Sequence, residues 1–517
     1  MNATRDCGVA MARMVLWLGV VLLLLSARAD APALSKPDPD AMMRSFLDAY
    51  WDGKKGYFLA WERTSPFKRP GASGPEGGTY SDFWWEAQLW DLVLDAATRD
   101  PNNAEYRKLV DDVYDGFVRE YPDFQNDFND DLGWWAQASM RAYNLTQNAR
   151  YLERAKTLFE DIWKYWTPAL DGGITWRRSN QSQKNVATNG PLTVIAVRLY
   201  QATKEESYLT RARQIYAWMD EKLTDGDSRV FDNYENGELR RWDFTYNVGN
   251  FVLASLAVRE VSSDEAEKTR LLSRAQKSMD WVLEDLTNAG IFLNEGGGDG
   301  GGFKGVTMRA LRRLADAPGL EADAKTRYDN ALRDMATQVW NVRRADGLVG
   351  ADWTMPQERG VIESLAAGSA VAAVQLASQP LEARVPTGDG RYEAENSARE
   401  GVNYSATASG YSGRAYINNF FKDDQFVQFH VNVPETRKYT LRWRYSAGGG
   451  EAVRVVSANE GAPSSVTLDA TPDWRTWAEH ETKLTLNAGP NRVRLEFDKA
   501  SGSKGWLNLD RVIVEAQ

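Results

Sequence analysis

The sequence predicts two folds in succession: an all-α (α/α)6 barrel, then an all-β module of the β-sandwich (jelly-roll) type. From about residue 37 to 378, apolar residues recur at spacings of three and four, which is typical of consecutive helices. After a stretch rich in Pro, Gly and charged residues, short alternating segments separated by turns take over. At 517 residues the chain is long enough for two domains, each with its own core.

The N-terminal residues predict the compartment. Arg5 and Arg13 precede an apolar run that is too short to span a bilayer, and small residues typical of a signal-peptidase site follow it. We therefore expect an exported protein, secreted or periplasmic, with no membrane span once the signal peptide is removed. The expected parts are a signal peptide at 1–31, a helical domain at 32–378, a linker at 379–390 and a β-sandwich module at 391–517.

About twelve helices are expected in the helical domain, because short links alternate with long loops rich in Gly or Trp. Twelve helices in six hairpins favour a closed barrel, in which the longer loops gather at one face and form a groove. An open helical solenoid fits the same count. The candidate helices are 37–51, 81–99, 103–120, 129–146, 148–166, 188–203, 205–222, 243–260, 263–286, 303–316, 320–341 and 357–378.

Composition excludes several classes of chemistry. The net charge of -10 argues against nucleic acid as a partner. The single cysteine, Cys7, lies in the predicted signal peptide, so the exported chain would have no disulfide and no cysteine nucleophile. Both histidines, His430 and His480, follow the helical domain, so proton transfer in that domain falls to Asp, Glu, Lys or Tyr. The 20 tryptophans suit either a sugar-stacking site or a large aromatic core.

Two adjacent carboxylates, Asp130 and Asp131, stand where a helix is expected to begin. Aspartate at a helix start has a structural explanation, since it caps free N–H groups and complements the helix dipole. The functional explanation is a glycosidase nucleophile and acid/base beside an aromatic pair. Neighbouring residues on a helix point about 100° apart, so the two carboxylates could straddle a scissile bond.

The sequence DDLGWWA at 130–136 closely resembles glycoside hydrolase family 76, the endo-α-1,6-mannanases, and the resemblance extends over nearly all of 37–378. It implies a retaining double displacement on α-mannan without a cofactor, in which Asp130 attacks the anomeric carbon and Asp131 is the general acid and later the base. A protonated Asp131 needs a raised pKa. Further matches lie at 141–146, 151–152, 172–176, 184–185, 189–190, 232, 245–247 and 303–305.

Other residues of the helical domain are candidates for binding mannose, although core packing or capping explains each almost as well. The candidates for stacking or hydrogen bonding are Trp134, Trp135, Trp176, Asp232, Tyr246 and Asn247. The family often has glutamine after the asparagine, where this chain has Val248. The glycine-rich run at 295–302 lacks the Lys-Ser/Thr ending of a phosphate-binding loop, so we expect a flexible loop at the groove edge ahead of a helix at Phe303.

In the β module, Glu393 and Glu395 occupy alternate positions, so a strand would place them on one face. With Asp510 they would make an oxygen-rich calcium site; solvent-exposed carboxylates are the alternative. The YEAE sequence at 392–395, together with Asn508 to Asp510, resembles carbohydrate-binding modules of families 6 and 35. That resemblance implies a structural calcium and sugar binding by Asn508, with Trp506 or Tyr411 as the stacking residue.

We thus expect a monomeric α-mannan hydrolase with an appended binding module. From another functional class, a non-catalytic glycan-capture protein is the alternative, although retention of the aspartate and tryptophan pairs counts against it. A transglycosylase on the same scaffold is also compatible, because a covalent glycosyl-enzyme can be intercepted by a sugar. A lyase or epimerase on the same barrel ranks below the hydrolase and the capture protein. Lyases and epimerases with helical barrels usually employ histidine or tyrosine bases, and the helical domain has no histidine.

Overall fold

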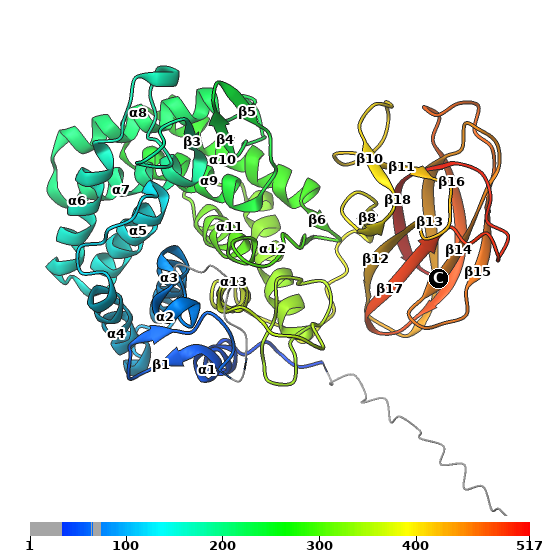
Figure 1. Ribbon diagram of the computed structural model, residues 1–517, viewed down its shortest axis with the longest axis horizontal. Helices are drawn as coiled ribbons and strands as arrows, with labels where there is room; N and C mark the ends of the chain where they lie inside the picture. Colours follow the sequence, from blue (N-terminus) through cyan, green and yellow to red (C-terminus); the bar gives the residue numbers. More distant parts are fainter. Residues whose placement is uncertain (1–33, 64, 66–73) are drawn as a thin grey trace, which may run out of the picture. The chain divides into compact units, whose positions relative to one another are not determined.

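The computed structural model describes residues 34–63, 65 and 74–517 (Figure 1). The predicted signal peptide at 1–31 lies outside the described residues. Among the residues that are described, no helix is long and apolar enough to cross a membrane.

The described residues of the helical domain contain every helix that the periodicity predicts, within a few residues at most ends, and two additional short helices, α2 and the 3-10 helix Ala169–Asp171. The helices are α1 Pro39–Tyr50, α2 Pro75–Gly78, α3 Phe83–Arg99, α4 Ala104–Glu120, α5 Asn129–Thr146, α6 Ala149–Trp163, α7 Val186–Thr203, α8 Glu206–Lys222, α9 Thr245–Val261, α10 Glu265–Asp285, α11 Gly300–Ala315, α12 Ala322–Asn341 and α13 Ser364–Gln375.

Six of these helices form a closed inner ring. The helices α3, α5, α7, α9, α11 and α13 each contact the next in that order, and α13 returns to contact α3 (Figure 1). The helices α4, α6, α8, α10, α12 and α1 pack against the ring from outside, and most of them, such as α12 between α11 and α13, contact two of its members. The ring closes, so the (α/α)6 barrel is confirmed and the open solenoid is excluded.

Inner and outer helices differ in the way their sequences hide apolar surface. Every residue of α13 is buried, as expected for a helix surrounded by others. In the outer helix α6, burial follows a single stripe that begins at Tyr151 and ends at Ile162. Polar N-caps start several outer helices; Asn103 and Asn148, for example, accept backbone N–H bonds from the first turns of α4 and α6.

Two predicted boundaries are wrong. The last helix begins at Ser364 instead of 357, since the preceding residues form a loop. The helix α11 begins at Gly300 instead of Phe303, so residues 300–302 are its buried first turn and not part of a flexible loop. Glycine is needed there for close packing: a Cβ on Gly301 would lie 3.0 Å from the Cβ of Ala366.

The loops of the helical domain contain three small antiparallel sheets, two of two strands and one of three. They are β1 Trp51–Asp52 with β2 Tyr57–Phe58, β3 Gln183–Asn185 with β4 Asn233–Glu235 and β5 Glu238–Arg240, and β6 Thr287–Asn288 with β7 Ile291–Phe292. Residues 379–390, the expected linker, contain neither helix nor strand.

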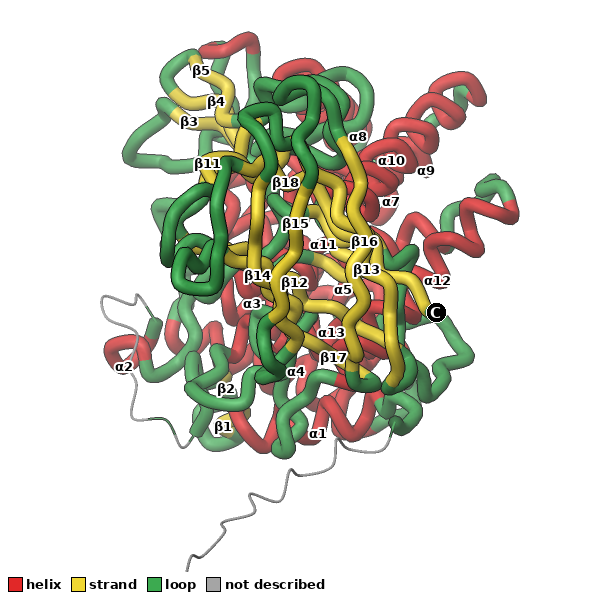
Figure 2. Tube along the Cα trace, turned by 90° about the vertical axis from the view of Figure 1, so that its right-hand side faces the viewer, coloured by secondary structure: helices red, strands yellow, loops and turns green. Residues whose placement is uncertain are grey.

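The C-terminal module consists of two antiparallel sheets around one apolar core (Figure 2). One sheet has the order β10-β11-β18-β13-β16, with β8 also paired to β18, and the other β15-β14-β17-β12-β9. Side chains alternate between core and surface along β12 and β13, as the sequence pattern predicts. The strands are β8 Arg391–Glu393, β9 Ala398–Glu400, β10 Asn403–Ser405, β11 Tyr416–Phe420, β12 Phe426–Val433, β13 Arg437–Ser446, β14 Ala452–Ala458, β15 Ser464–Leu468, β16 Ala478–Leu486, β17 Gly489–Glu496 and β18 Leu507–Ala516.

Two glycines inside helices should respond oppositely to alanine. In α4, a Cβ on Gly116 would lie 1.7 Å from the carbonyl oxygen of Gly56, whereas the nearest atom to a Cβ on Gly133 of α5 is 3.9 Å away. We expect Gly116→Ala to lower the stability of the helical domain by about 1–3 kcal/mol through overpacking. Gly133→Ala should leave stability unchanged or raise it by up to about 1 kcal/mol, because alanine has the higher helix propensity. Calorimetric unfolding measures both, and equal shifts would contradict the packing argument.

Candidate active site

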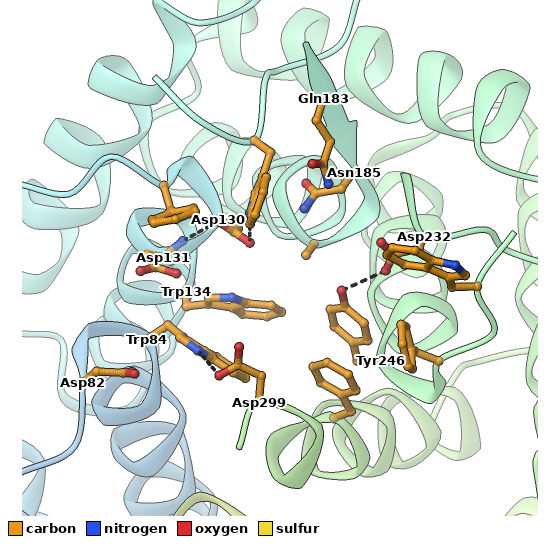
Figure 3. Close-up of a pocket in the computed structure, with 16 residues that line it drawn as sticks. Asp82, Trp84, Asp130, Asp131, Trp134, Gln183, Asn185, Asp232, Tyr246 and Asp299 are labelled. Atoms are coloured by element: carbon orange, nitrogen blue, oxygen red, sulfur yellow. Dashed lines mark hydrogen bonds between the residues drawn. The ribbon is translucent and has the colours of Figure 1, made fainter. Parts of the chain in front are cut away.

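A groove of about 480 Å³ lies at one end of the helical ring, where the inner helices begin. Five residues that directly precede inner helices line it, namely Asp82, Phe128, Asn185, Phe244 and Asp299. The N-termini of α3, α5, α7, α9 and α11 therefore face the same space (Figure 3). Free N–H groups and the positive ends of helix dipoles favour negative charge at such a place.

Asp130 and Asp131 occupy the first turn of α5 and line the groove. Asp130 accepts two hydrogen bonds, from Nε1 of Trp176 at 2.9 Å and from the backbone N–H of Asp131 at 3.1 Å. Asp131 accepts one, from Nδ2 of Asn126 at 2.8 Å. Asp130 thus contributes to capping its helix, as the structural explanation predicts, while the same carboxylate faces the groove.

A buried asparagine fixes the start of α5 to the loop that carries Trp176. The backbone N–H of Asn129 donates to the carbonyl oxygen of Trp176 at 2.8 Å, and its Nδ2 donates to that of Thr175 at 2.9 Å. Its Oδ1 accepts from Nε of Arg178 at 2.9 Å. These contacts hold the indole N–H of Trp176 in line with Asp130.

Lys184 holds the other end of this loop. Its buried ammonium group donates to the carbonyl oxygen of Thr167 at 3.1 Å and also to those of Ala169 and Gly172. Burial lowers the pKa of Lys184 to about 8. Three backbone acceptors around one ammonium group give the loop a rigid base.

The local environment favours retention of a proton by the aspartate pair. Burial is the main cause that raises the pKa of Asp130 above its ordinary value, against the two N–H donors that stabilise its ionised form. The pKa of Asp131 is raised well above the ordinary value, first by burial and then by the negative charges of Asp130, Asp82 and Asp299. The two groups titrate as a pair, and Asp131, with fewer donors, is the better place for the proton.

Aromatic side chains and a further carboxylate, Asp232, form other walls of the groove. The ring of Tyr246 stacks on Phe303 with centroids 4.0 Å apart, and its hydroxyl donates to Asp232 at 3.0 Å (Figure 3). Across from them, the indoles of Trp84 and Trp134 have centroids 6.4 Å apart. Flat apolar faces beside polar acceptors are typical of sites that bind sugar rings.

Most of the substrate-binding residues named from the sequence line the groove, but two do not. Those that line it are Trp134, Trp176, Asp232 and Tyr246. Trp134 is 4% exposed and forms part of the floor.

The predicted role of Trp135 in sugar stacking is wrong, because this side chain is fully buried. Its ring packs on Phe117 with centroids 3.7 Å apart, and its Nε1 donates to the carbonyl oxygen of Phe83 at 2.9 Å. Trp134 lines the groove, whereas Trp135, about 100° further round the same helix, points into the core.

The prediction that Asn247 contacts substrate is also wrong. Its side chain is fully buried and does not line the groove. It instead hydrogen bonds to Asp232, and so holds a groove carboxylate from behind.

Ten of the sixteen residues that line the groove were not among the site residues named from the sequence. Five of them directly precede inner helices, three lie in the first turns of inner helices, and the other two lie in the strand β3 and in a loop. They are Asp82, Phe128, Asn185, Phe244 and Asp299, then Trp84, Ala187 and Phe303, then Gln183 and Trp242. For the five that precede inner helices, the N-cap position was a usable signal, since the residue before each inner helix must lie at the groove face of a closed barrel.

The three carboxylates expected to bind calcium are buried near one another in the module. Oε1 of Glu393 and Oε2 of Glu395 have no hydrogen-bond partner. Burial, with the neighbouring charges of Asp510 and Glu393 respectively, raises their pKa values to about 7 and about 8. Asp510 is paired with Arg444 and Ser412. In the described part of the chain, no group of three or more His, Cys, Asp or Glu side chains is arranged to hold a metal ion.

The residues expected to bind sugar in the module differ in accessibility. Trp506 is 50% exposed and stacks on Phe421 with centroids 3.7 Å apart. Tyr411 packs against Tyr416 with centroids 5.6 Å apart. Asn508 is 8% exposed and lies within β18.

A helical barrel that holds two adjacent carboxylates between aromatic walls, without histidine, has the architecture of a glycoside hydrolase. The chain belongs to glycosyl hydrolase family 76, whose model matches residues 38–389. Residues 390–517 match the model of carbohydrate binding module family 35.

Solved structures and curated proteins agree with this assignment. The α-1,6-mannanase of family 76 from Salegentibacter sp. HEL1_6 is 28% identical, with a TM-score of 0.59, and the match covers 65% of this chain and 97% of that one. An inactive variant of it, with two consecutive aspartates changed to asparagine, was solved with α-1,6-mannotriose.

Among curated proteins, a putative mannan endo-1,6-α-mannosidase of Schizosaccharomyces pombe is 26% identical over 46% of this chain and 60% of its own length. An isomaltosyltransferase of Sporosarcina globispora is 31% identical over 24% of this chain. The chain spans only 11% of the transferase and 60% of the mannosidase.

The raised pKa values have a consequence for stability. A carboxyl whose pKa is higher in the folded than in the unfolded state binds more protons when folded, so stability falls as pH rises above about 4. We therefore expect Asp131→Asn to raise the unfolding temperature at pH 7–8, on the order of 1 kcal/mol of stability, with the difference vanishing near pH 4. Asp111→Asn, which changes a surface carboxylate paired with Arg150, is the control and should show no such gain. A pH-independent effect of Asp131→Asn would refute the assigned direction.

Proposed function

We propose that this protein is an exported, endo-acting α-1,6-mannanase that retains the anomeric configuration of its substrate. The observation that carries the proposal is the pair Asp130 and Asp131 in the groove of a family 76 barrel. The similar mannanase that is inactive when two consecutive aspartates are replaced supports it.

The contacts of the two aspartates suit different roles. Asp130 accepts N–H bonds from Trp176 and from the backbone of Asp131, which stabilise the carboxylate that a nucleophile needs. Asp131 has a single amide donor and lies beside the charge of Asp130, which favours the protonated form that a general acid needs.

In the proposed reaction, a carboxylate oxygen of Asp130 attacks the anomeric carbon while the bond to the leaving sugar oxygen breaks. Asp131 gives its proton to that oxygen, and a covalent glycosyl-aspartate remains. Asp131, now a carboxylate, then takes a proton from water as the water attacks the same carbon and releases Asp130. Two inversions at one carbon give net retention.

The extent of the aromatic lining favours cleavage within a chain. Trp176 lies beside Asp130, whereas Trp242, which is 55% exposed, belongs to the loop before α9. Stacking surfaces on both sides of the groove suit several successive sugar units. The surrounding carboxylates also favour an uncharged glycan such as mannan over an anionic one.

Transfer to a sugar acceptor is the second candidate reaction. The glycosyl-aspartate could react with a sugar hydroxyl in place of water, since both attack the same carbon. Time courses with added α-1,6-mannobiose separate the two reactions, because transfer yields products longer than the donor.

Activity assays test the proposal directly. We expect wild type to convert linear α-1,6-mannan into short oligosaccharides, with the first product in the α configuration by NMR. Asp130→Asn and Asp131→Asn should each lower kcat by at least about 1000-fold, with folding unchanged by circular dichroism. Asp111→Asn is the matched surface control and should keep full activity. Active pair variants, or a first product in the β configuration, would refute the assignment.

For the module, we propose that a calcium ion binds Glu393 and Glu395 together with Asp510. Oε1 of Glu393 and Oε2 of Glu395 support this site, because both are buried without a hydrogen bond, and a cation would offset the negative charge of Glu393 that raises the pKa of Glu395. Nε of Arg391 lies 3.5 Å from Oε1 of Glu393. In the same module, we propose half-exposed Trp506 as the stacking surface for a sugar, and Asn508 and Tyr411 as further sugar-binding residues because of the family resemblance.

Calcium should therefore stabilise the module. We expect millimolar calcium to raise its unfolding temperature and EGTA to reverse the rise, because a ligand that binds only the folded state stabilises it. Glu395→Gln should abolish the calcium response, whereas Glu435→Gln, on a surface turn, should preserve it. An equal response in both variants would place any bound calcium elsewhere.

A further inference from the structure

The glycine-rich run before α11 ends at a carboxylate that the mechanism above does not use. Asp299 directly precedes α11, is exposed, and lines the groove. Figure 3 shows it beside Trp84, in the same space as the catalytic pair. Five aspartates line the groove, and Asp299 is one of three that lie outside the catalytic pair.

Two neighbouring indoles are tied to a single oxygen of Asp299. Nε1 of Trp84 donates to its Oδ1 at 3.1 Å, and Nε1 of Trp85 donates to the same oxygen at 3.0 Å. An indole N–H can only donate, so both need an acceptor at this point. Trp84 lines the groove, whereas Trp85 is fully buried. Asp299 therefore links the groove wall to the core.

The position of Asp299 is fixed by the glycines that follow it. A Cβ on Gly302 would lie 2.9 Å from Cη2 of Trp84 and 2.9 Å from Cδ2 of Leu365. A Cβ on Gly300 would lie 2.2 Å from the carbonyl oxygen of Glu295. Only glycine allows the first turn of α11 to approach α3 and α13 this closely, and this approach brings Asp299 within reach of both indoles.

Asp299 also belongs to the electrostatic surroundings of the catalytic pair. Its negative charge is among the causes that raise the pKa of both Asp130 and Asp131. The negative charge of Asp82, before α3, also raises the pKa of Asp131, and Asp130 in turn raises that of Tyr246 on α9. Other charged groups on the neighbouring elements are Asp232 before β4, the ion pair of Asp127 and Arg177 in the loops before α5 and α7, and Glu363 before α13, which accepts from the backbone N–H of Gly298.

We propose that Asp299 is a positioning residue for glycosidic bond cleavage: it fixes the indole of Trp84 as the wall on which a mannose ring stacks, and it keeps a negative charge facing the catalytic pair. The inference rests on the proposed mannanase activity. The acceptor oxygen and the charge are separable, because asparagine keeps the first and removes the second.

Three variants separate these contributions. Asp299→Asn keeps an oxygen for both indoles, so KM on α-1,6-mannan should stay within about 2-fold of wild type while the alkaline limb of kcat/KM moves to lower pH. That displacement should shrink at high salt. Asp299→Ala removes the acceptor and should raise KM about 10-fold, with a change in tryptophan fluorescence. Asp316→Ala, at the far end of α11 and paired with Arg312, is the control and should match wild type.

Two results would overturn the proposal. One is wild-type KM and pH dependence in both Asp299 variants. The other is an equal loss in Asp299→Asn and Asp299→Ala without any displacement of the pH profile, which would show a merely structural role. Wild-type inactivity on α-1,6-mannan would instead refute the proposed function. In that case, the role of Asp299 can still be tested by measuring the binding of α-1,6-mannotriose through tryptophan fluorescence. We expect Asp299→Ala to weaken this binding and Asp299→Asn to leave it unchanged.

Discussion

The parallel course of the inner helices is the constraint on which the rest of the structure depends. Each hairpin returns the chain through an outer helix, so every inner helix begins at the same face of the ring. The residues before α3, α5, α7, α9 and α11 consequently line one groove. Helix N-termini carry unpaired N–H groups and partial positive charge, so this face can hold several carboxylates in a small volume. The chemistry of the site follows from that property.

Two opposing effects set the protonation of the carboxylates at this face. Helix N-termini and N–H donors stabilise negative charge, whereas burial and mutual repulsion oppose it. For Asp130, two N–H donors act against burial. For Asp131, repulsion from its neighbours adds to burial, and only Asn126 acts against both. One proton shared unequally between adjacent aspartates is the condition that a double displacement requires. Asp130 and Asp131 belong to the same helix turn, so the helix itself does not distinguish them. The unequal division of the proton therefore arises from their different loop contacts, with Trp176 for Asp130 and with Asn126 for Asp131.

The sequence predicted the helices well because each has to hide apolar surface with a period near 3.6 residues. It predicted the strand alternation in the module on similarly local grounds, whereas the catalytic roles of Asp130 and Asp131 came from the resemblance to family 76. The sequence did not predict the features that depend on packing between distant parts of the chain. Periodicity could not show that the glycines of α11 form a buried turn, because their role depends on Ala366 and Trp84, which are distant in sequence. For the same reason Asp299 escaped notice among flexible-looking neighbours.

The positions of Trp134 and Trp135 show that the core packing and the geometry of the active site depend on the same helix. Trp134 contributes to the groove floor, and the next residue, Trp135, fills the core against Phe117. Both lie within about one turn of Asp130 on the same helix. The helix therefore cannot rotate to alter the groove without exposing Trp135, and the core cannot repack without moving the catalytic pair. An active site built on the first turn of a core helix gains fixed geometry from this coupling, which a site carried by loops alone would lack.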